Sequence, residues 1–150
     1  MRLGTTRVLS ICPETWVQLE STENRLLDFR LIKHPDTEIY LSVLSSRDDN
    51  DFVTPNINRW RQQMGQLPLT QEQVAELPTV MMFGQPARRV TIDGSFKGFG
   101  SPQPKAGYRM VGAILQIPQF TFFVKMTGPQ HVVAQEEPNF DEFVSTLKFR

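Results

Sequence analysis

Two long apolar runs constrain the fold of this chain more than any other feature. They are "YRMVGAILQI" at residues 108–117 and "FTFFVKMT" at residues 120–127, and only Pro118 and Gln119 separate them. A link of this length joins antiparallel strands, and both alternating faces of the second run carry apolar side chains. We therefore predict an antiparallel hairpin at the centre of one sheet, with other elements covering both of its faces.

Shorter segments with the period-two alternation of β-strands precede this hairpin. The first set comprises residues 16–21, 25–32 and 38–46, which are separated by polar turns. A second pair comprises residues 79–83 and 87–93. Such short spacings favour hairpins, so we expect antiparallel pairing.

The window "PNINRWRQQMGQL" has the spacing of an amphipathic helix. Ile57, Trp60 and Met64 fall on one side of a helical projection, which predicts that this side faces the sheet. We place Asn56 at the N-cap of this helix and Gly65 at its C-terminal cap.

Further helical segments follow along the chain. Thr70 with Gln73 three residues later is typical of a capping box, and Pro78 ends that short helix. Near the C-terminus, Pro129 starts a short helix and Asn139 caps another one that carries an apolar stripe. Together with the strands, these helices predict a single α+β domain in which an antiparallel sheet lies between helical layers.

Length and charge exclude several classes of protein. At 150 residues, of which 39% are hydrophobic, the chain can form one domain with its own core. Basic and acidic residues balance at 16 each without a run of five like charges, so a nucleic-acid partner is not expected. The single cysteine, Cys12, excludes an internal disulfide and a multi-cysteine metal site. No stretch reaches the roughly 18 consecutive apolar residues of a transmembrane segment.

The N-terminal segment "MRLGTTRVLSIC" faintly resembles a lipoprotein signal. Its apolar run from Val8 to Ile11 is too short for a signal core of about 7–15 residues, and Ile11 is bulky where the cleavage site needs a small residue. We expect instead a first strand or arm with a buried Cys12. The chain as written would then be soluble, and either cytoplasmic or the mature part of an exported precursor.

The sequence carries no catalytic signature. A Gly-x-Ser-x-Gly elbow, a Walker phosphate loop and a His-Glu-x-x-His motif do not occur in it. His34 and His131 lack partners at metal-ligand spacing, and the acidic pairs at residues 48–49 and 136–137 are interpreted as solvated loop charges. We therefore expect a protein that is not an enzyme and that binds no cofactor or metal.

Several of these pieces, in this order, resemble a known family. They are the helical segment "PNINRWRQQMGQLPLTQEQVAELP", the strand pair "RMVGAILQIPQFTFFVKMTGP" and the terminal "FDEFVSTLKF". Together they are similar to the small domains with the Mog1/PsbP-like fold, most of all to bacterial proteins with an Asn-x-Asn-Arg-Trp-Arg helix. The resemblance extends from Trp16 to Phe149 and implies an α/β/α sandwich around an antiparallel sheet. Better-known members of the group bind proteins: one type engages a small GTPase, and another engages a photosynthetic membrane complex. Many exported relatives carry a signal peptide or lipid anchor, and this chain departs from them in that respect.

The first candidate binding residues are Asn58, Trp60 and Arg61, all in the predicted helix. A helical projection turns Arg59 toward water and puts Arg61 at the edge of the buried stripe, where its stem can cover apolar surface and its guanidinium can find a carboxylate or carbonyl. Packing against the sheet accounts for Trp60 without any ligand. The alternative is a groove beside the helix, in which Trp60 and Arg61 anchor a partner.

The other candidates lie in or near a predicted loop. Residues 94–107 contain four Gly, two Pro and two Ser, which indicates a loop. Phe96 and Phe99 flank Lys97 there, so the loop is either a partner-binding tip or a cover over a sheet edge. Lys125, on an otherwise apolar strand, either lines the same face or extends its ammonium to the end of the sheet.

Two functional classes remain open. The favoured one is a non-enzymatic interaction or accessory domain that binds a protein or a cell-envelope component. The other is a small-ligand carrier with a pocket between sheet and helices. A cavity of about 300 Å³ or more lined by Phe and Trp would favour the carrier. A packed interior with an exposed apolar patch would favour the interaction domain.

Overall fold

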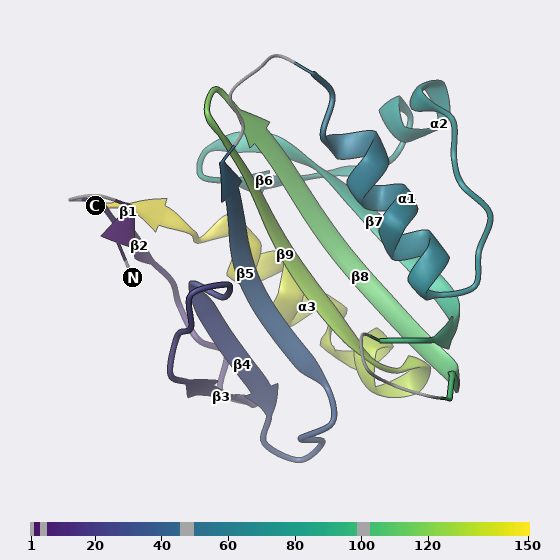
Figure 1. Cartoon of the computed structure of the whole chain (residues 1–150). Helices are drawn as coiled ribbons and strands as arrows, with labels where there is room; N and C mark the ends of the chain where they lie inside the picture. Colours follow the sequence, from purple (N-terminus) through teal and green to yellow (C-terminus); the bar gives the residue numbers. More distant parts are fainter. Residues whose placement is uncertain (1, 4–5, 46–49, 99–102) are drawn as a thin grey trace.

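The computed structural model describes residues 2–3, 6–45, 50–98 and 103–150. Within them, seven strands form one antiparallel sheet in the order β3-β4-β5-β9-β8-β7-β6, and helices α1 and α3 lie on its opposite faces (Figure 1). The strands of this sheet are β3 (Trp16–Leu19), β4 (Leu27–Leu31), β5 (Glu38–Ser45), β6 (Thr79–Met82), β7 (Gln85–Phe96), β8 (Lys105–Ile117) and β9 (Phe120–Pro129). The helices are α1 (Val53–Gln63), α2 (Gln71–Ala75) and α3 (Gln130–Ser145). This is the predicted α+β arrangement of an antiparallel sheet between helices.

The central hairpin consists of β8 and β9, as predicted. Ile117 pairs with Phe120 at its turn, where Gln119 has a positive φ of 74°. β9 is buried on both faces, because Val124 lies in the core under α3 and Phe123 lies in the core under α1. Helices on both sides therefore remove both faces of the hairpin from water.

Local helix signals predict three further features correctly. Three apolar side chains of the α1 segment face the sheet and have no exposed surface: Ile57, Trp60 and Met64. Gly65 follows with a φ of 71°, as expected for a C-terminal cap. α2 opens with the predicted capping box, in which the Gln73 N–H donates to Oγ1 of Thr70 at 3.1 Å and the Thr70 N–H donates to Oε1 of Gln73 at 2.9 Å.

The start of α1 differs from the predicted N-cap at Asn56. The helix begins at Val53, and Oδ1 of Asp51 accepts hydrogen bonds from the backbone N–H groups of Val53 (2.9 Å) and Thr54 (3.3 Å). Asn56 lies inside the helix and donates its side-chain amide to the carbonyl of Phe52 at 2.6 Å. A carboxylate just before the helix thus satisfies the free N–H groups that Asn56 was expected to satisfy.

The C-terminal segment forms one helix, α3, rather than the two predicted. Pro138 lies inside it and removes one backbone hydrogen bond, which is why the sequence favours a break there. Val133 before the proline and Phe140 and Phe143 after it are buried in the same core. Packing on both sides of the proline therefore holds the segment in one continuous helix. Asn139 is therefore an interior residue of α3 and does not cap a helix.

The acidic pair at residues 136–137 also lies on α3, so its interpretation as solvated loop charges is wrong. Oε1 of Glu136 accepts a hydrogen bond from Nε1 of the buried Trp16 at 2.7 Å. Glu137 accepts from Arg89 at 3.0 Å and from Arg109 at 2.8 Å. Both carboxylates join α3 to the strands.

The predicted loop at residues 94–107 is shorter than expected. β7 continues to Phe96, β8 begins at Lys105, and these two residues pair across an irregularity in the register. A β-bulge accommodates glycine within a strand, so the composition of this segment misled the prediction. Phe99 and the acidic pair at residues 48–49 lie outside the described residues.

The two ends of the chain meet in a second, smaller sheet. Its order is β1-β2-β10, formed by β1 (Arg2–Leu3), β2 (Thr6–Leu9) and β10 (Lys148–Phe149) (Figure 1). Val8 packs into the core beside α3. Cys12 is exposed, which corrects the expectation that it is buried: the chain has left β2 by that point, and Val8 supplies the buried side chain.

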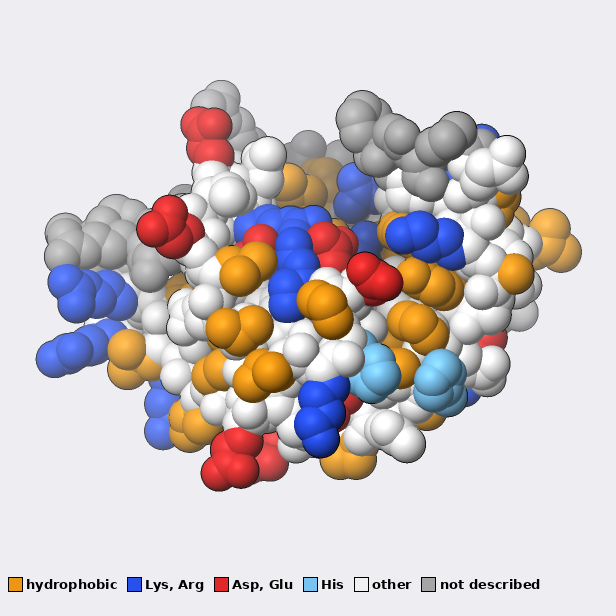
Figure 2. All heavy atoms as spheres, turned by 90° about the horizontal axis from the view of Figure 1, so that it is seen from below, with side chains coloured by type: hydrophobic (Ala, Val, Ile, Leu, Met, Phe, Trp, Pro, Cys, Tyr) orange, Lys and Arg blue, Asp and Glu red, His pale blue; other side chains and the backbone are white. Residues whose placement is uncertain are grey.

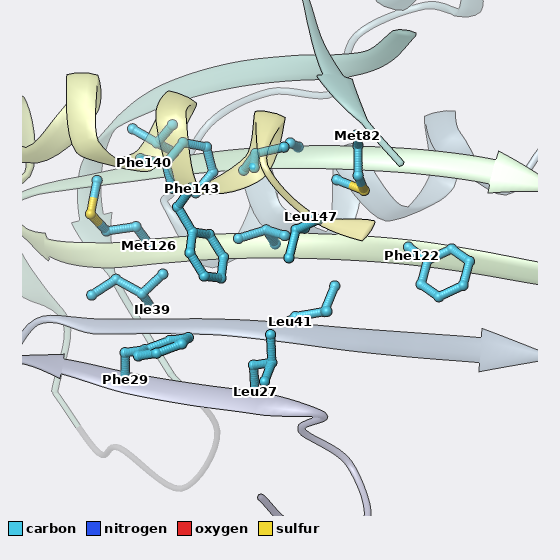
Figure 3. Packing of buried hydrophobic residues seen from close by; sticks show 14 of the residues in the cluster. Leu27, Phe29, Ile39, Leu41, Met82, Phe122, Met126, Phe140, Phe143 and Leu147 are labelled. Carbon is cyan, nitrogen blue, oxygen red and sulfur yellow. The ribbon is translucent and has the colours of Figure 1, made fainter. Parts of the chain in front are cut away.

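Each helical layer encloses its own core. On the side of α3, Phe140, Phe143 and Leu147 point toward the strands (Figure 3). The strand residues that face them include Leu27, Phe29, Ile39, Leu41, Phe122 and Met126. The second core forms around Trp60 on the side of α1. Among the helices of the described chain, none is long and apolar enough to cross a membrane.

Candidate functional site

Helix α1 covers only part of its face of the sheet. It lies over β7 and β8 and leaves β4 and β5 uncovered on that side (Figure 1). Alternation along β5 sends Ile39 and Leu41 into the core under α3, and it sends Tyr40 to the face that carries α1. On the uncovered part of this face, Glu38 and Tyr40 are partly exposed, whereas Asp28 and Ser42 are buried.

Lys125 on β9 marks the border between α1 and the uncovered strands. It pairs with Tyr40 of β5 on one side and with Gly112 of β8 on the other, and only 6% of its surface is exposed. Its Nζ donates a hydrogen bond to Oε1 of Gln63 at 3.2 Å. The same atom lies 5.6 Å from the ring centroid of Tyr40 and 5.8 Å from that of Trp60. The ammonium is thus enclosed by one amide and two aromatic rings.

This environment changes the acidity of Lys125. Burial first, and then the charges of Arg59 and Arg25, lower its pKa to about 8. Burial likewise raises the pKa of the neighbouring Tyr40 phenol. The ammonium stays beside α1, so the expectation that it extends to the end of the sheet is wrong. Near neutral pH, Lys125 is still mostly a buried cation.

Two arginines and two carboxylates lie on or next to the adjoining strands: Arg30 and Asp28 on β4, Glu38 on β5, and Arg25 just before β4. Cζ of Arg25 lies 4.0 Å from the ring centroid of Tyr40, and its Nη1 contacts Asp28 at 3.3 Å and Glu38 at 3.5 Å. Arg30 contacts the same two carboxylates at 2.5 Å and 2.9 Å. Asp28 and Glu38 are therefore each shared by both arginines.

Two hollows meet at Lys125. One has a volume of about 410 Å³ and extends toward Phe96 and Lys105, and the other has a volume of about 330 Å³ and extends toward Arg59 and Phe123. Four residues line both of them: Arg25, Tyr40, Gln63 and Lys125. We call the two together the Lys125 hollow. Its charged lining residues are Arg25, Arg59, Lys105 and Lys125 against Glu23 and Glu38, which leaves an excess of positive charge.

Two of the sequence-predicted binding residues, Phe96 and Lys125, line this hollow. Phe96 is stacked on Tyr108 with ring centroids 6.0 Å apart. Lys97 is exposed, and its backbone N–H donates to the carbonyl of Gln63 at 2.8 Å, which joins the end of β7 to the end of α1. Lys97 therefore flanks the hollow through its backbone, while Phe96 contributes its ring.

The other sequence-predicted residues hold the helices together. The side-chain amide of Asn58 accepts from the N–H of Leu69 at 2.7 Å and donates to its carbonyl at 2.9 Å. Nε of Arg61 donates to the carbonyl of Leu67, as the helical projection allowed. Both contacts fix the link between α1 and α2. Trp60 lies fully buried behind Lys125, and its Nε1 has no hydrogen-bond partner within the described residues.

Sequence reasoning missed Arg25, Tyr40 and Gln63, which line the hollow with Lys125. The register of β5 on β9 brings Tyr40 to Lys125, and the placement of α1 over the sheet brings Gln63 there. The available signal is the alternation of β5, which puts Tyr40 on the face opposite to Ile39.

The remainder of the surface is mixed in character. Figure 2, which shows the side with the β3 edge, has scattered hydrophobic side chains around a central group of basic and acidic ones. Val17, Leu19 and Ile32 are exposed hydrophobic residues, and both histidines, His34 and His131, are exposed. Among the described residues, no three His, Cys, Asp or Glu side chains gather in a way that could hold a metal ion.

Comparison with known proteins identifies the fold. No protein-family model matches the sequence, and no curated protein matches it. The structure is similar to that of LpqN, a Mycobacterium tuberculosis protein involved in cell envelope biogenesis, with a TM-score of 0.56 and 12% identity over 97% of this chain and 84% of LpqN. It is also similar to the cyanobacterial PsbP (CyanoP) of Synechocystis, with a TM-score of 0.53 and 8% identity over 99% of this chain and 94% of that one.

A third similar structure is longer than this chain. A protein from Bacteroides thetaiotaomicron matches with a TM-score of 0.54 and 15% identity over 95% of this chain, which spans only 45% of that protein. At these identities the likeness shows the fold alone. The predicted PsbP/Mog1-like fold is thereby confirmed, and the Asn-x-Asn-Arg-Trp-Arg helix remains a feature of this sequence that these comparisons do not test.

Proposed function

We propose that this chain is a non-enzymatic accessory domain that binds a protein partner over the Lys125 hollow. The observation that carries the proposal is the combination of an uncovered sheet face with a buried, positively charged side chain at its border. A lysine that is 6% exposed lacks most of its hydration, and the fold alone would be served as well by an apolar residue of similar length. A partner that covers the hollow and contacts the ammonium would account for a charged residue at this position.

The geometry of the interior favours this function over a small-ligand carrier. Ile57, Trp60 and Met64 fill the space between α1 and the sheet and have no exposed surface. The Lys125 hollow opens beside α1, and its lining mixes charged and aromatic side chains. A carrier pocket is mostly apolar and buries most of its ligand, whereas a surface recess with charged walls suits part of a larger partner.

The similar structures leave the choice of function to the site itself. LpqN is involved in cell envelope biogenesis, and the cyanobacterial protein is a PsbP; neither is described by a reaction. Because fold similarity does not transfer function by itself, the proposal depends on the hollow and not on these neighbours.

A site-specific crosslinker tests the proposal. A benzophenone amino acid in place of Tyr40 keeps an aromatic ring in the hollow, and the same group in place of Ala134, exposed on α3, serves as the control. After irradiation in the producing cells, we expect one defined protein adduct at residue 40 that is missing at residue 134. The same adducts at both positions, or none at residue 40, would contradict the proposal.

A further inference from the structure

The ammonium of Lys125 is only partly satisfied by the fold. It has three N–H donors, and Oε1 of Gln63 accepts one of them at 3.2 Å. Tyr40 and Trp60 offer ring faces and no strong acceptor. Within the described residues, no carboxylate lies within ion-pair distance of this Nζ.

Arg59 is another cation of the hollow without a carboxylate partner among the described residues. It precedes Gln63 by four residues on α1, so both side chains lie on the same flank of the helix. Arg59 and Lys125 both line the smaller hollow, and the positive charge of Arg59 acts on Lys125. No ion pair joins Arg59 to any described acidic residue.

The neighbouring arginines behave differently. Arg25 and Arg30 each contact both Asp28 and Glu38, so these two carboxylates are already engaged. Among the described residues, three cations of the hollow therefore lack an ion pair: Lys105 near Phe96, and Lys125 and Arg59, which both line the smaller hollow next to α1.

Resting on the proposed binding function, we infer that the partner places a carboxylate, from a Glu or Asp side chain, between Lys125 and Arg59. A carboxylate has two oxygens and can accept one hydrogen bond from each cation. Its single negative charge suits a hollow that is also lined by Glu23 and Glu38, which would repel a doubly charged phosphate more strongly. The ring of Phe123 beside Arg59 supplies an apolar wall for the methylene groups of the incoming side chain.

Binding of a model acidic peptide tests the inference. The probe is an acetylated and amidated peptide of alternating Glu and Gly, titrated into the ¹⁵N-labelled full chain and followed by backbone amide shifts. A Gln-Gly peptide of equal length controls for the backbone, and inorganic phosphate controls for the kind of anion. We expect saturable shifts around Tyr40, Gln63 and Lys125 with the Glu peptide, at least about tenfold tighter than with either control.

Variants then assign the binding to the two cations. We expect Lys125→Met to weaken the Glu peptide by about tenfold or more, and Arg59→Gln to weaken it severalfold. Lys33→Met, which changes an exposed lysine elsewhere, should leave the affinity unchanged. Because Arg59 is exposed, its variant keeps the fold and the test remains decisive even if Lys125→Met does not fold.

Other results would overturn the inference. Equal binding of the Glu and Gln peptides, tighter binding of phosphate, or full affinity in both variants would each show that the hollow does not select a carboxylate. If the crosslink at residue 40 still forms in the Lys125→Met variant at its full yield, the carboxylate inference fails while the proposed function stands. If the crosslink is absent from the unaltered hollow as well, the proposed function itself fails.

Discussion

The six-membered ring of Trp60 lies against the backbone of Gly112, and a Cβ at residue 112 would stand 2.4 Å from its Cζ3 atom. Gly112 pairs with Lys125 across β8 and β9, and Lys125 pairs with Tyr40 across β9 and β5. The missing side chain at Gly112 lets α1 approach the sheet closely. Trp60 therefore forms the wall that separates the packed half of this face from the Lys125 hollow.

Substitution Gly112→Ala should destabilise the protein by about 1–3 kcal/mol, because a fully buried ring cannot move aside in a packed core. Urea denaturation measures this cost. In the Gly112→Ala background, Trp60→Leu should cost less than it does alone, since it removes the ring that clashes. If the losses in the free energy of unfolding are strictly additive in this double-mutant cycle, the side chains at residues 60 and 112 do not clash.

Two arginines two positions apart on α1 should differ in their effect on stability. Arg61 is half-buried and its Nε donates to the carbonyl of Leu67, whereas Arg59 is exposed. We expect Arg61→Ala to lower the free energy of unfolding by about 1–2 kcal/mol and Arg59→Ala to change it by no more than about 0.5 kcal/mol. Urea titration of both variants checks this order. The reverse order would mean that Arg59, and not Arg61, lies at the edge of the buried side of α1.

Glu136 should contribute more to stability than another glutamate of the same helix. It accepts hydrogen bonds from Nε1 of Trp16 at 2.7 Å and from Oγ1 of Thr15 at 2.8 Å, and the Trp16 side chain is only 3% exposed. Glu136→Ala leaves that indole N–H without its acceptor, so we expect a loss of about 1–3 kcal/mol. Glu142→Ala, at an exposed position of α3, is the control and should cost no more than about 0.5 kcal/mol. Equal thermal stability of the two variants would refute a structural role for Glu136.

The parts of the fold that sequence reasoning predicted are those with local causes. The capping box at Thr70, the glycine cap at Gly65 and the two-residue turn of the central hairpin each depend on neighbours within a few positions. Pro138 shows where local reasoning fails. A proline breaks an isolated helix, but here buried side chains on both sides of it stabilise one continuous α3.

The site was less predictable, because long-range pairing assembles it. Lys125 stands out in the sequence as a charge on an apolar strand, and Phe96 as an aromatic residue in a glycine-rich segment. Neither pattern indicates Tyr40 or Arg25, whose position beside Lys125 depends on the register of β5 on β9. The same limit explains Glu136, since its partner Trp16 lies at the other end of the chain.

The stability of the protein should depend on pH through Lys125. Its pKa is about 8 in the folded chain against 10.5 for an ordinary lysine, and the groups around it are Arg25, Glu38, Tyr40 and Arg59. Between these two pH values the unfolded chain binds more protons than the folded one, so the free energy of unfolding rises with pH. The cost of the buried charge is thus fully present below about pH 8 and is lost as the pH approaches 10.5.

Lys125→Met isolates this contribution, because methionine keeps the length of the side chain and the four charged or phenolic neighbours remain. We expect the variant to be more stable than the unaltered protein at pH 7, by about 1–3 kcal/mol, with the difference shrinking steadily between pH 8 and 10. Urea titrations of both proteins at pH 7, 8.5 and 10 measure it. A difference that does not change with pH would mean that Lys125 is not desolvated in the folded state. A variant that is more stable but no longer binds the acidic peptide would show that the Lys125 cation lowers the stability of the fold and is needed for binding.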